Sequence, residues 1–392
     1  MQRRRFLAAG GVGASGLLAG CTDVLGDDDD SVPERDPANE VADSIATAVG
    51  LTNTAALSLD SVDTDFEDPE QIEFDEDEPR DRLDAARTAL EDAEAADDGS
   101  REGDIVAVRS YIELVESMLD MFVALLAGGS ELADSDESFD PDEIEQLRES
   151  IDRAREPIER AVSARSTGVD RLTSVDESVL AALDAEFETV ADGFAELESF
   201  TDGFDALTAG YGTLLDGVEH VDTAQAQFEA EEYDGARDGF GDATAEFDAA
   251  NVTFTDGRPD AHEELDGEFD RATGRSDSLV RLSSSHESML DGRELLVEGQ
   301  EEFEEENFAA ASAAFSGAQE EFTAASEELD AEPQPDGEFE VEFEQARCRA
   351  ANLSESADEF AAAADAAERG DLVEAEQRFE DGEEALDAVT DC

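Results

Sequence analysis

The sequence predicts an all-α fold, an elongated array or bundle of long antiparallel helical hairpins. Apolar residues recur at intervals of three and four from Val41 onward, which is the spacing of one face of an α-helix. The period-two alternation that is typical of strands is nearly absent. One apolar series continues from Leu180 to Phe228, and helices with so long a heptad-like seam pack side by side at shallow angles.

The first folded segment, residues 37–170, is predicted to be an N-terminal helical bundle. Its clearest helix carries a seam of aliphatic and aromatic residues, and the acidic residues between them lie off that seam and exclude a membrane span. Breaks are expected at 60–79 and 128–141, and Pro157 is expected to kink or divide a helix over 141–166. The seam consists of Ile105, Val108, Ile112, Val115, Leu119, Phe122 and Leu126.

The remaining chain is predicted to form long helical hairpins over residues 171–330, a Pro-rich linker over 331–337 and a C-terminal helical hairpin over 338–392. A further break is expected at 255–259, where Pro259 interrupts the pattern.

The charge of the chain is unusual and limits the classes of partner. The sequence holds 108 acidic and 25 basic residues, a formal net charge of −83, and every basic residue is Arg. Salt near 1 M shortens the Debye length to roughly 3 Å and makes such a charge tolerable. The apolar fraction of 40% favours a folded core over disorder. Nucleic acid is not expected as a partner, because phosphate binding needs clustered basic residues.

The amino terminus has the basic, apolar and small-residue regions of a signal peptide over residues 1–20, followed by an acidic tether over 21–36. Its first part resembles the twin-arginine export motif, and its end resembles a lipobox. With the acidic composition, the chain resembles a haloarchaeal exported lipoprotein. The resemblance implies a lipid on Cys21 and a place on the extracellular face of the cytoplasmic membrane. The export residues are Arg3, Arg4, Phe6 and Leu7, and the lipobox is Leu18, Ala19, Gly20 and Cys21.

Three stretches of the C-terminal half share one set of spacings. Each has an aromatic or small residue, then an apolar residue five positions on, and then Ala, a large apolar residue and a small residue on a second helix. The key positions are Phe228, Tyr233, Ala236, Phe240, then Phe303, Phe308, Ala311, Phe315, then Ala367, Leu372, Ala375, Phe379.

This set of spacings resembles the turn and second helix of a tetratricopeptide repeat. The copies lie 75 and 64 residues apart, whereas tetratricopeptide repeats recur at about 34. The resemblance therefore implies a tetratricopeptide-like array of hairpins with longer first helices.

Apart from Cys21, the sequence holds only Cys348 and Cys392, and each lies 22 residues from Gly370. If Gly370 marks the turn of the last hairpin, both cysteines reach the same level of antiparallel helices. An exported chain meets oxidising conditions, so we predict a disulfide, and two free thiols are the alternative.

No catalytic constellation is found in the sequence. His220, His262 and His286 form no metal-binding pair, and no nucleophile elbow, P-loop or CxxC is present. His286 falls on an apolar seam, where a core histidine is expected. We expect no metal site and no cofactor, and we expect the chain not to be an enzyme.

The sequence-based hypothesis is a membrane-anchored extracellular lipoprotein that acts as a non-enzymatic helical scaffold for protein–protein interaction or envelope assembly. Its expected partners are membrane lipid through Cys21 and a protein at the cell surface. The alternative is a solute- or cation-binding lipoprotein that serves a transporter or sensor. A hydrolase that uses carboxylates is a third, weaker hypothesis.

Overall fold

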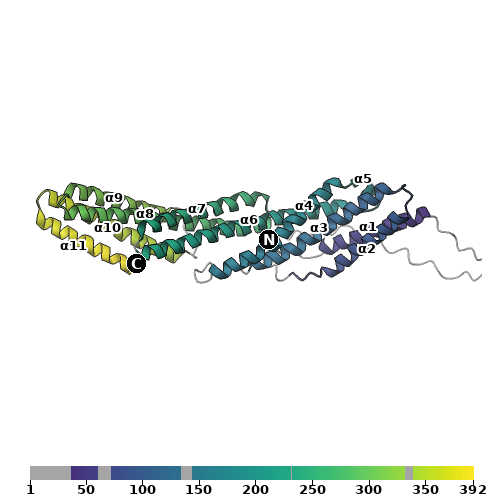
Figure 1. The fold of residues 1–392 in the computed structure, drawn as a ribbon, viewed down its shortest axis with the longest axis horizontal. Helices are drawn as coiled ribbons and strands as arrows, with labels where there is room; N and C mark the ends of the chain where they lie inside the picture. The colour runs from purple at the N-terminus through teal and green to yellow at the C-terminus, as the bar shows by residue number, and fades with distance from the viewer. Residues whose placement is uncertain (1–36, 61–71, 134–143, 231, 332–338) are drawn as a thin grey trace, which may run out of the picture. The chain divides into compact units, whose positions relative to one another are not determined.

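The computed structural model describes residues 37–60, 72–133, 144–230, 232–331 and 339–392. These residues contain eleven α-helices and no strand, which confirms the predicted all-α fold. Consecutive helices pack in pairs (Figure 1). The helices are α1 (Pro37–Asp60), α2 (Asp77–Ala96), α3 (Glu102–Ala133), α4 (Ile144–Ser174), α5 (Glu177–Ala182), α6 (Phe187–Glu229), α7 (Tyr233–Gly257), α8 (Asp266–Glu304), α9 (Phe308–Asp330), α10 (Glu340–Glu368) and α11 (Leu372–Ala388).

The described residues divide into two compact units. Unit 1 runs to Leu126 and adds Arg160–Glu198, whereas unit 2 comprises Ala127–Glu159 and Ser199–Cys392. The divisions fall within the residue ranges of α3, α4 and α6.

Unit 1 is built around α3. The predicted seam is buried apart from Leu126, which is partly exposed, and residues between its members, such as Leu114, Met118 and Met121, are buried as well. This helix therefore contributes to the core on more than one side. Partners reach it from α1, where Asn53 accepts a hydrogen bond from the Tyr111 hydroxyl at 2.9 Å, and from α6, where Gly193 lies against Met118.

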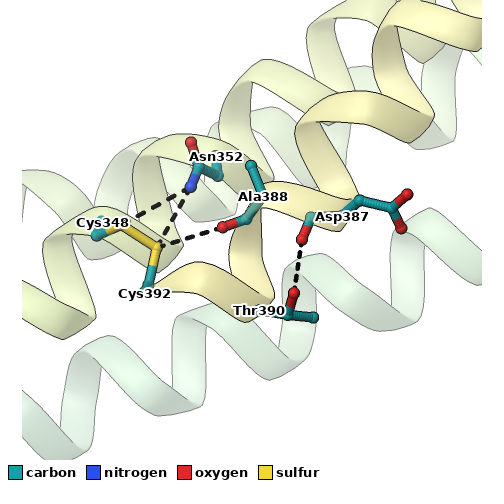
Figure 2. The surroundings of a disulfide bond; sticks show 6 residues. All are labelled: Cys348, Asn352, Asp387, Ala388, Thr390 and Cys392. Carbon is teal, nitrogen blue, oxygen red and sulfur yellow. Dashed lines mark hydrogen bonds between the residues drawn. A yellow bond between two sulfur atoms is a disulfide. The ribbon is translucent and has the colours of Figure 1, made fainter.

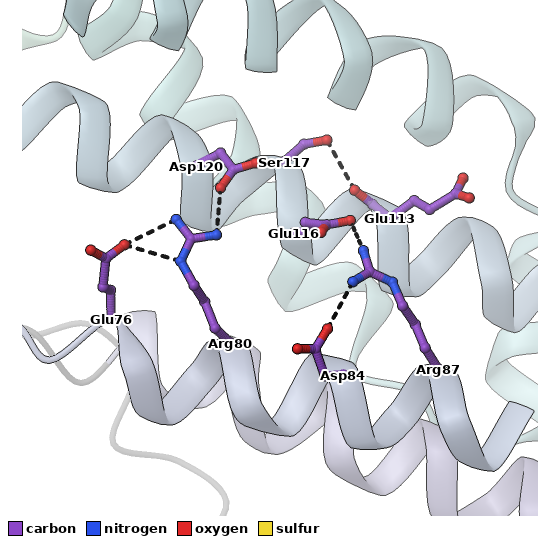
Figure 3. A network of polar contacts seen from close by, with 8 residues as sticks. All are labelled: Glu76, Arg80, Asp84, Arg87, Glu113, Glu116, Ser117 and Asp120. Atoms are coloured by element: carbon purple, nitrogen blue, oxygen red, sulfur yellow. Dashed lines mark hydrogen bonds and ion pairs between the residues drawn. The ribbon is translucent and has the colours of Figure 1, made fainter.

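Arginine–carboxylate pairs join α2 to α3 at the surface of unit 1. Figure 3 shows Arg80 of α2 between Glu76 and Asp120, with Arg80 Nη1 2.9 Å from Asp120 Oδ1. Two turns further along α2, Arg87 pairs with Glu116. All four of these side chains of α2 and α3 keep about a third or more of their surface in solvent, so each exposed pair contributes only about 0–1 kcal/mol.

A buried polar contact ties α1 to α3 and to the turn between α5 and α6. Asn53 Oδ1 accepts from the hydroxyl of fully buried Tyr111 and from the Glu186 backbone N–H at 3.1 Å, while Asn53 Nδ2 donates to the Asp184 carbonyl at 3.0 Å. Burial raises the pKa of Tyr111, and the nearby Glu186 carboxylate raises it further. The phenol is therefore neutral and donates its proton to Asn53.

Unit 2 is a succession of antiparallel helices in which α7, α8, α9, α10 and α11 each pack on the next (Figure 1). Helix α8 lies at its centre, since it contacts α7, α9 and α10. Its buried face contains several serines, and their hydroxyls bond to backbone carbonyls of the preceding turn, as Ser276 Oγ does to the Ala272 carbonyl at 3.1 Å. These bonds satisfy the buried hydroxyls and let neighbouring helices approach closely.

Two predicted helix boundaries in the N-terminal half differ from the structure. The break expected from residue 128 does not begin there, because α3 continues to Ala133 and Gly128 lies inside it against Ile158, where a Cβ would be 2.9 Å from Ile158 Cγ1. Pro157 does not divide its helix, and α4 continues through it to Ser174. Tertiary packing of Ile158 and its buried neighbours outweighs the helix-breaking tendency of Pro157.

Candidate functional site

The predicted export motif, lipobox and tether lie outside the described residues, and so does the Pro-rich linker apart from Ala331. The lipid on Cys21 therefore stays a prediction. The repeat positions and the two C-terminal cysteines are described, and they lie together in unit 2.

The three copies of the repeat share one turn. In each, the backbone N–H of the residue just before the second helix donates to the carbonyl five positions earlier, the hydrogen bond that closes a Schellman turn. Such a turn needs a residue in the left-handed region, and Glu306 (φ 64°) and Gly370 (φ 80°) occupy it in copies 2 and 3. The bonds are Glu232 to Gln227 at 2.9 Å, Asn307 to Glu302 at 2.8 Å and Asp371 to Ala366 at 2.9 Å.

Aromatic rings close the first two turns in the same way. The rings of Phe228 and Tyr233 meet edge to face at 5.8 Å, and those of Phe303 and Phe308 do so at 5.3 Å. Copy 3 has no ring at either position, because Ala367 and Leu372 stand there. The third turn thus keeps the backbone of the other two without their aromatic pair.

The second helices of copies 1 and 2 bury the Ala and Phe positions of the repeat, whereas their first residues, Tyr233 and Phe308, keep some exposure. Ala236, Phe240, Ala311 and Phe315 are at most 3% exposed. In copy 3, Ala375 is buried but Phe379 is only partly so, although its ring lies 4.8 Å from that of Phe360.

Cys348 and Cys392, the two residues that the sequence analysis paired, form a disulfide with their Cα atoms 5.7 Å apart. Figure 2 shows the side-chain nitrogen of Asn352 facing both sulfurs, 3.3 Å from Cys392 Sγ. The bond fastens the segment after α11 to the middle of α10. Because Cys348 is exposed, the disulfide is accessible to a reductant.

The first turn of α11 exposes two apolar side chains. Leu372 is 68% exposed and Val373 is 78% exposed, and both belong to the first turn of α11. The corresponding residue of copy 2, Phe308, packs instead against a small cluster contributed by the next hairpin, Ala366, Ala367 and Ala375. No later hairpin covers Leu372 in the described chain.

Two histidines stack on phenylalanine rings in unit 2. His262 lies 4.0 Å from Phe200 and His286 lies 5.1 Å from Phe240, measured between ring centroids. Burial lowers the pKa of both imidazoles, and His286 Nδ1 bonds to the Leu282 carbonyl at 2.7 Å. Neutral His286 is thus part of the core, as its place on an apolar seam suggested.

Sequence reasoning missed a series of glycines that receive phenylalanine rings. A Cβ at Gly217 would lie 2.5 Å from Phe247 Cε1, and one at Gly299 would lie 2.5 Å from Phe315 Cε1. The glycines come in pairs seven residues apart, and so do the rings that face them. The seven-residue spacing of these glycines is visible in the sequence and could have predicted that another helix approaches their backbone closely. The pairs are Gly210 with Phe254, Gly217 with Phe247, Gly292 with Phe322, Gly299 with Phe315, and, singly, Gly382 with Phe360.

Two arginines that cap α9 were also missed. Arg281 of α8 and Arg347 of α10 both donate to carbonyls in the last turn of α9, and both guanidinium groups lie over the Phe343 ring. Cations at a helix C-terminus are stabilising, because they bond to the last carbonyls, which have no partner within the helix, and interact favourably with the helix dipole. The bonds run from Arg281 to the carbonyls of Glu328 (3.1 Å), Leu329 (2.9 Å) and Ala331 (2.6 Å), and from Arg347 to Leu329 (2.6 Å).

In the part of the chain that the structure describes, no three or more His, Cys, Asp or Glu side chains are grouped so that they could hold a metal ion. Among the same residues, no helix combines the length and the apolar character needed to cross a membrane.

Comparisons of the chain with protein-family models, with curated proteins and with solved structures find no match. The candidate site is therefore defined by geometry alone: the repeated turns of unit 2 and the uncovered apolar end at Leu372 and Val373.

Proposed function

We propose that the protein is a lipoprotein held on the extracellular face of the cytoplasmic membrane through Cys21, where it acts as a non-enzymatic helical scaffold for protein–protein interaction or envelope assembly. The tetratricopeptide-like repeat and the twin-arginine export signal are parts of the same proposal.

One observation carries the scaffold proposal: unit 2 repeats a hairpin whose end remains uncovered. Copy 2 packs Phe308 against Ala366 and Ala367 of the next hairpin. Arrays of this kind are stabilised by neighbour contacts, and their terminal faces must be polar or covered. Because Leu372 and Val373 are neither, this part of α11 suits a contact with another protein.

The anchor is tested by replacing Cys21 with Ser in the producing cells. We expect the unaltered protein in the membrane fraction, with a mass that includes lipid, and the Cys21→Ser protein without lipid. Cys348→Ser with Cys392→Ser is the matched control, since it removes the other two cysteines but leaves the lipobox intact. Retention of lipid by the Cys21→Ser protein would refute the anchor.

The scaffold role is tested on intact cells in molar salt with a cross-linker that does not cross membranes. We expect reproducible adducts between unit 2 and a protein of the cell surface. A protein that gives none, yet retains a small solute or cation through purification, would support the binding-lipoprotein alternative instead.

A further inference from the structure

One exposed face of α11 corresponds to the face that α9 uses to receive α10. The three second helices begin at Tyr233, Phe308 and Leu372. We number positions by how many residues they follow this first residue. Positions 4, 11 and 15 lie on one side of the helix, since a turn takes 3.6 residues. On α9 these positions are Ser312, Gln319 and Thr323.

Neutral side chains meet acidic ones at the junction of α9 and α10. Ser312 Oγ donates to Asp365 at 2.7 Å and Gln319 Nε2 donates to Asp358 at 3.2 Å. The hydroxyls of Thr323 and Ser354 form a third hydrogen bond, with 3.4 Å between their oxygens. No carboxylate faces a carboxylate at these three contacts, so the two acidic helices can pack.

The junction of α7 and α8 has a cation at position 4, although Asp248, at position 15, lies near the Asp277 carboxylate of α8. Arg237, at position 4 of copy 1, lies 2.9 Å from Asp291 and 3.1 Å from Glu294 of α8. In both junctions the second helix of one copy, α7 or α9, has a hydrogen-bond donor at position 4. The first helix of the next copy, α8 or α10, has a carboxylate opposite that donor.

On α11 the same three positions are Glu376, Glu383 and Asp387, and all three are exposed. Leu372 and Val373 flank this stripe at its amino-terminal end. We call these five residues the open face. Their charges would repel any further acidic hairpin, including one from a second copy of this chain, because its arriving face carries Asp358 and Asp365.

We propose that the open face docks a helical hairpin of a partner protein that presents basic residues to the carboxylates and small residues to Leu372 and Val373. The charge pattern of the inner junctions is inverted here, so the arriving helix must supply the cations. The small residues follow from copy 2, where three alanines cover the residue equivalent to Leu372. The proposal rests on the scaffold function and names the chemistry of its partner.

A designed peptide probes the open face directly. The peptide copies residues 339–368, the helix that α9 receives, with Ser354→Arg, Asp358→Arg and Asp365→Arg, and the control peptide keeps the native residues. Binding to the full chain is measured by fluorescence anisotropy at a salt concentration where circular dichroism shows it folded. We expect the basic peptide to bind at least about tenfold more tightly than the native one.

Variants of the full chain locate the contact. Glu376→Gln with Glu383→Gln and Asp387→Asn is expected to abolish that preference, whereas Glu320→Gln with Glu327→Gln and Glu344→Gln, which removes as many exposed acids elsewhere, keeps it. The reversed chain, Glu376→Arg with Glu383→Arg and Asp387→Arg, is expected to bind the native peptide instead.

Two outcomes would overturn the proposal. One is equal binding of the basic peptide to the chains with and without the open-face acids, which would mark general attraction to an acidic coat. The other is that the basic peptide does not bind the unaltered chain and the native peptide does not bind the reversed chain. Either result leaves the scaffold function standing if cross-linking on cells still finds a partner at another surface.

Discussion

The two units solve the packing of acidic helices in different ways. In unit 1, α3 buries aliphatic side chains of its own on several sides, such as Leu114, Val115 and Leu119. Unit 2 sets phenylalanine rings against glycines at intervals of seven, as Phe247 lies on Gly217. Unit 1 also contains a Phe–Gly contact, between Phe194 and Gly168, but it does not belong to such a series among the described residues.

The difference concerns how a core tolerates change. An aliphatic core around one helix can redistribute small changes in volume among many neighbours, whereas a ring seated on a backbone has little room to move. Unit 2 also ends in α11, whose buried residues are only Ala375, Gly382 and Ala385. We therefore expect unit 2 to be the more sensitive unit, at its ring contacts and at its last helix.

The largest effect is expected from loss of the disulfide. Cys348→Ser with Cys392→Ser opens a loop of 44 residues, which the chain-entropy relation values at about 4 kcal/mol. Since α11 buries no large side chain fully, we expect it to detach first. Hydrogen exchange followed by mass spectrometry should show faster exchange in α11 and unchanged exchange in α3; equal acceleration in both would contradict the expectation.

The Phe–Gly contacts are tested by Gly217→Ala. A Cβ there would lie 2.5 Å from Phe247 Cε1, and overpacking of this kind costs about 1–3 kcal/mol in urea unfolding. Gly241→Ala is the matched control in α7, because its nearest neighbour, Glu287, lies at an ordinary 3.7 Å. The control should gain about 0.5–1 kcal/mol from helix propensity, and the same loss in both variants would refute the role of the ring contact.

In unit 1 the corresponding weak point is polar. Asn53→Ala removes the acceptor of the buried Tyr111 hydroxyl, and leaving such a group unsatisfied costs about 1–3 kcal/mol. Adding Tyr111→Phe removes the stranded hydroxyl and should recover part of the loss. A double-mutant cycle from urea unfolding measures this coupling, and strict additivity would show that the bond contributes nothing.

The smallest effect expected is a difference in response to pH. Every histidine lies in unit 2, and burial lowers the pKa of His262 and His286 below their usual 6.5. The unfolded chain therefore binds protons at higher pH than the folded one, so unit 2 loses stability as the pH falls through about 6.5. The raised pKa values of Asp277 and Glu287 act in the opposite direction at lower pH.

Hydrogen exchange at pH 7.5 and 6.0 measures this response for each unit. We expect faster opening of unit 2 at the lower pH, after correction for the intrinsic exchange rate, and no such change in unit 1. His262→Gln with His286→Gln should remove the difference; if it persists in that variant, the histidines are not its cause.

Much of unit 2 was predictable because its signals are local. The spacing that joins Phe303 to Phe308 and Ala311 fixes a turn followed by a helix face, and the distance of each cysteine from Gly370 placed them at one level. Boundaries were less predictable in the N-terminal half. Gly128 and Pro157 both read as breaks, yet both lie within helices whose neighbours hold them.

The sequence by itself determined that the chain is helical, that its C-terminal half repeats one turn and one helix face, and that its two C-terminal cysteines can meet. Periodicity carries this information because 3.6 residues per turn is a property of each helix alone. Only the tertiary structure decided which ring sits on which glycine, how Asn53 satisfies Tyr111 and which face of α11 remains open. Those features depend on residues far apart in the chain, whose contacts form only when the helices pack.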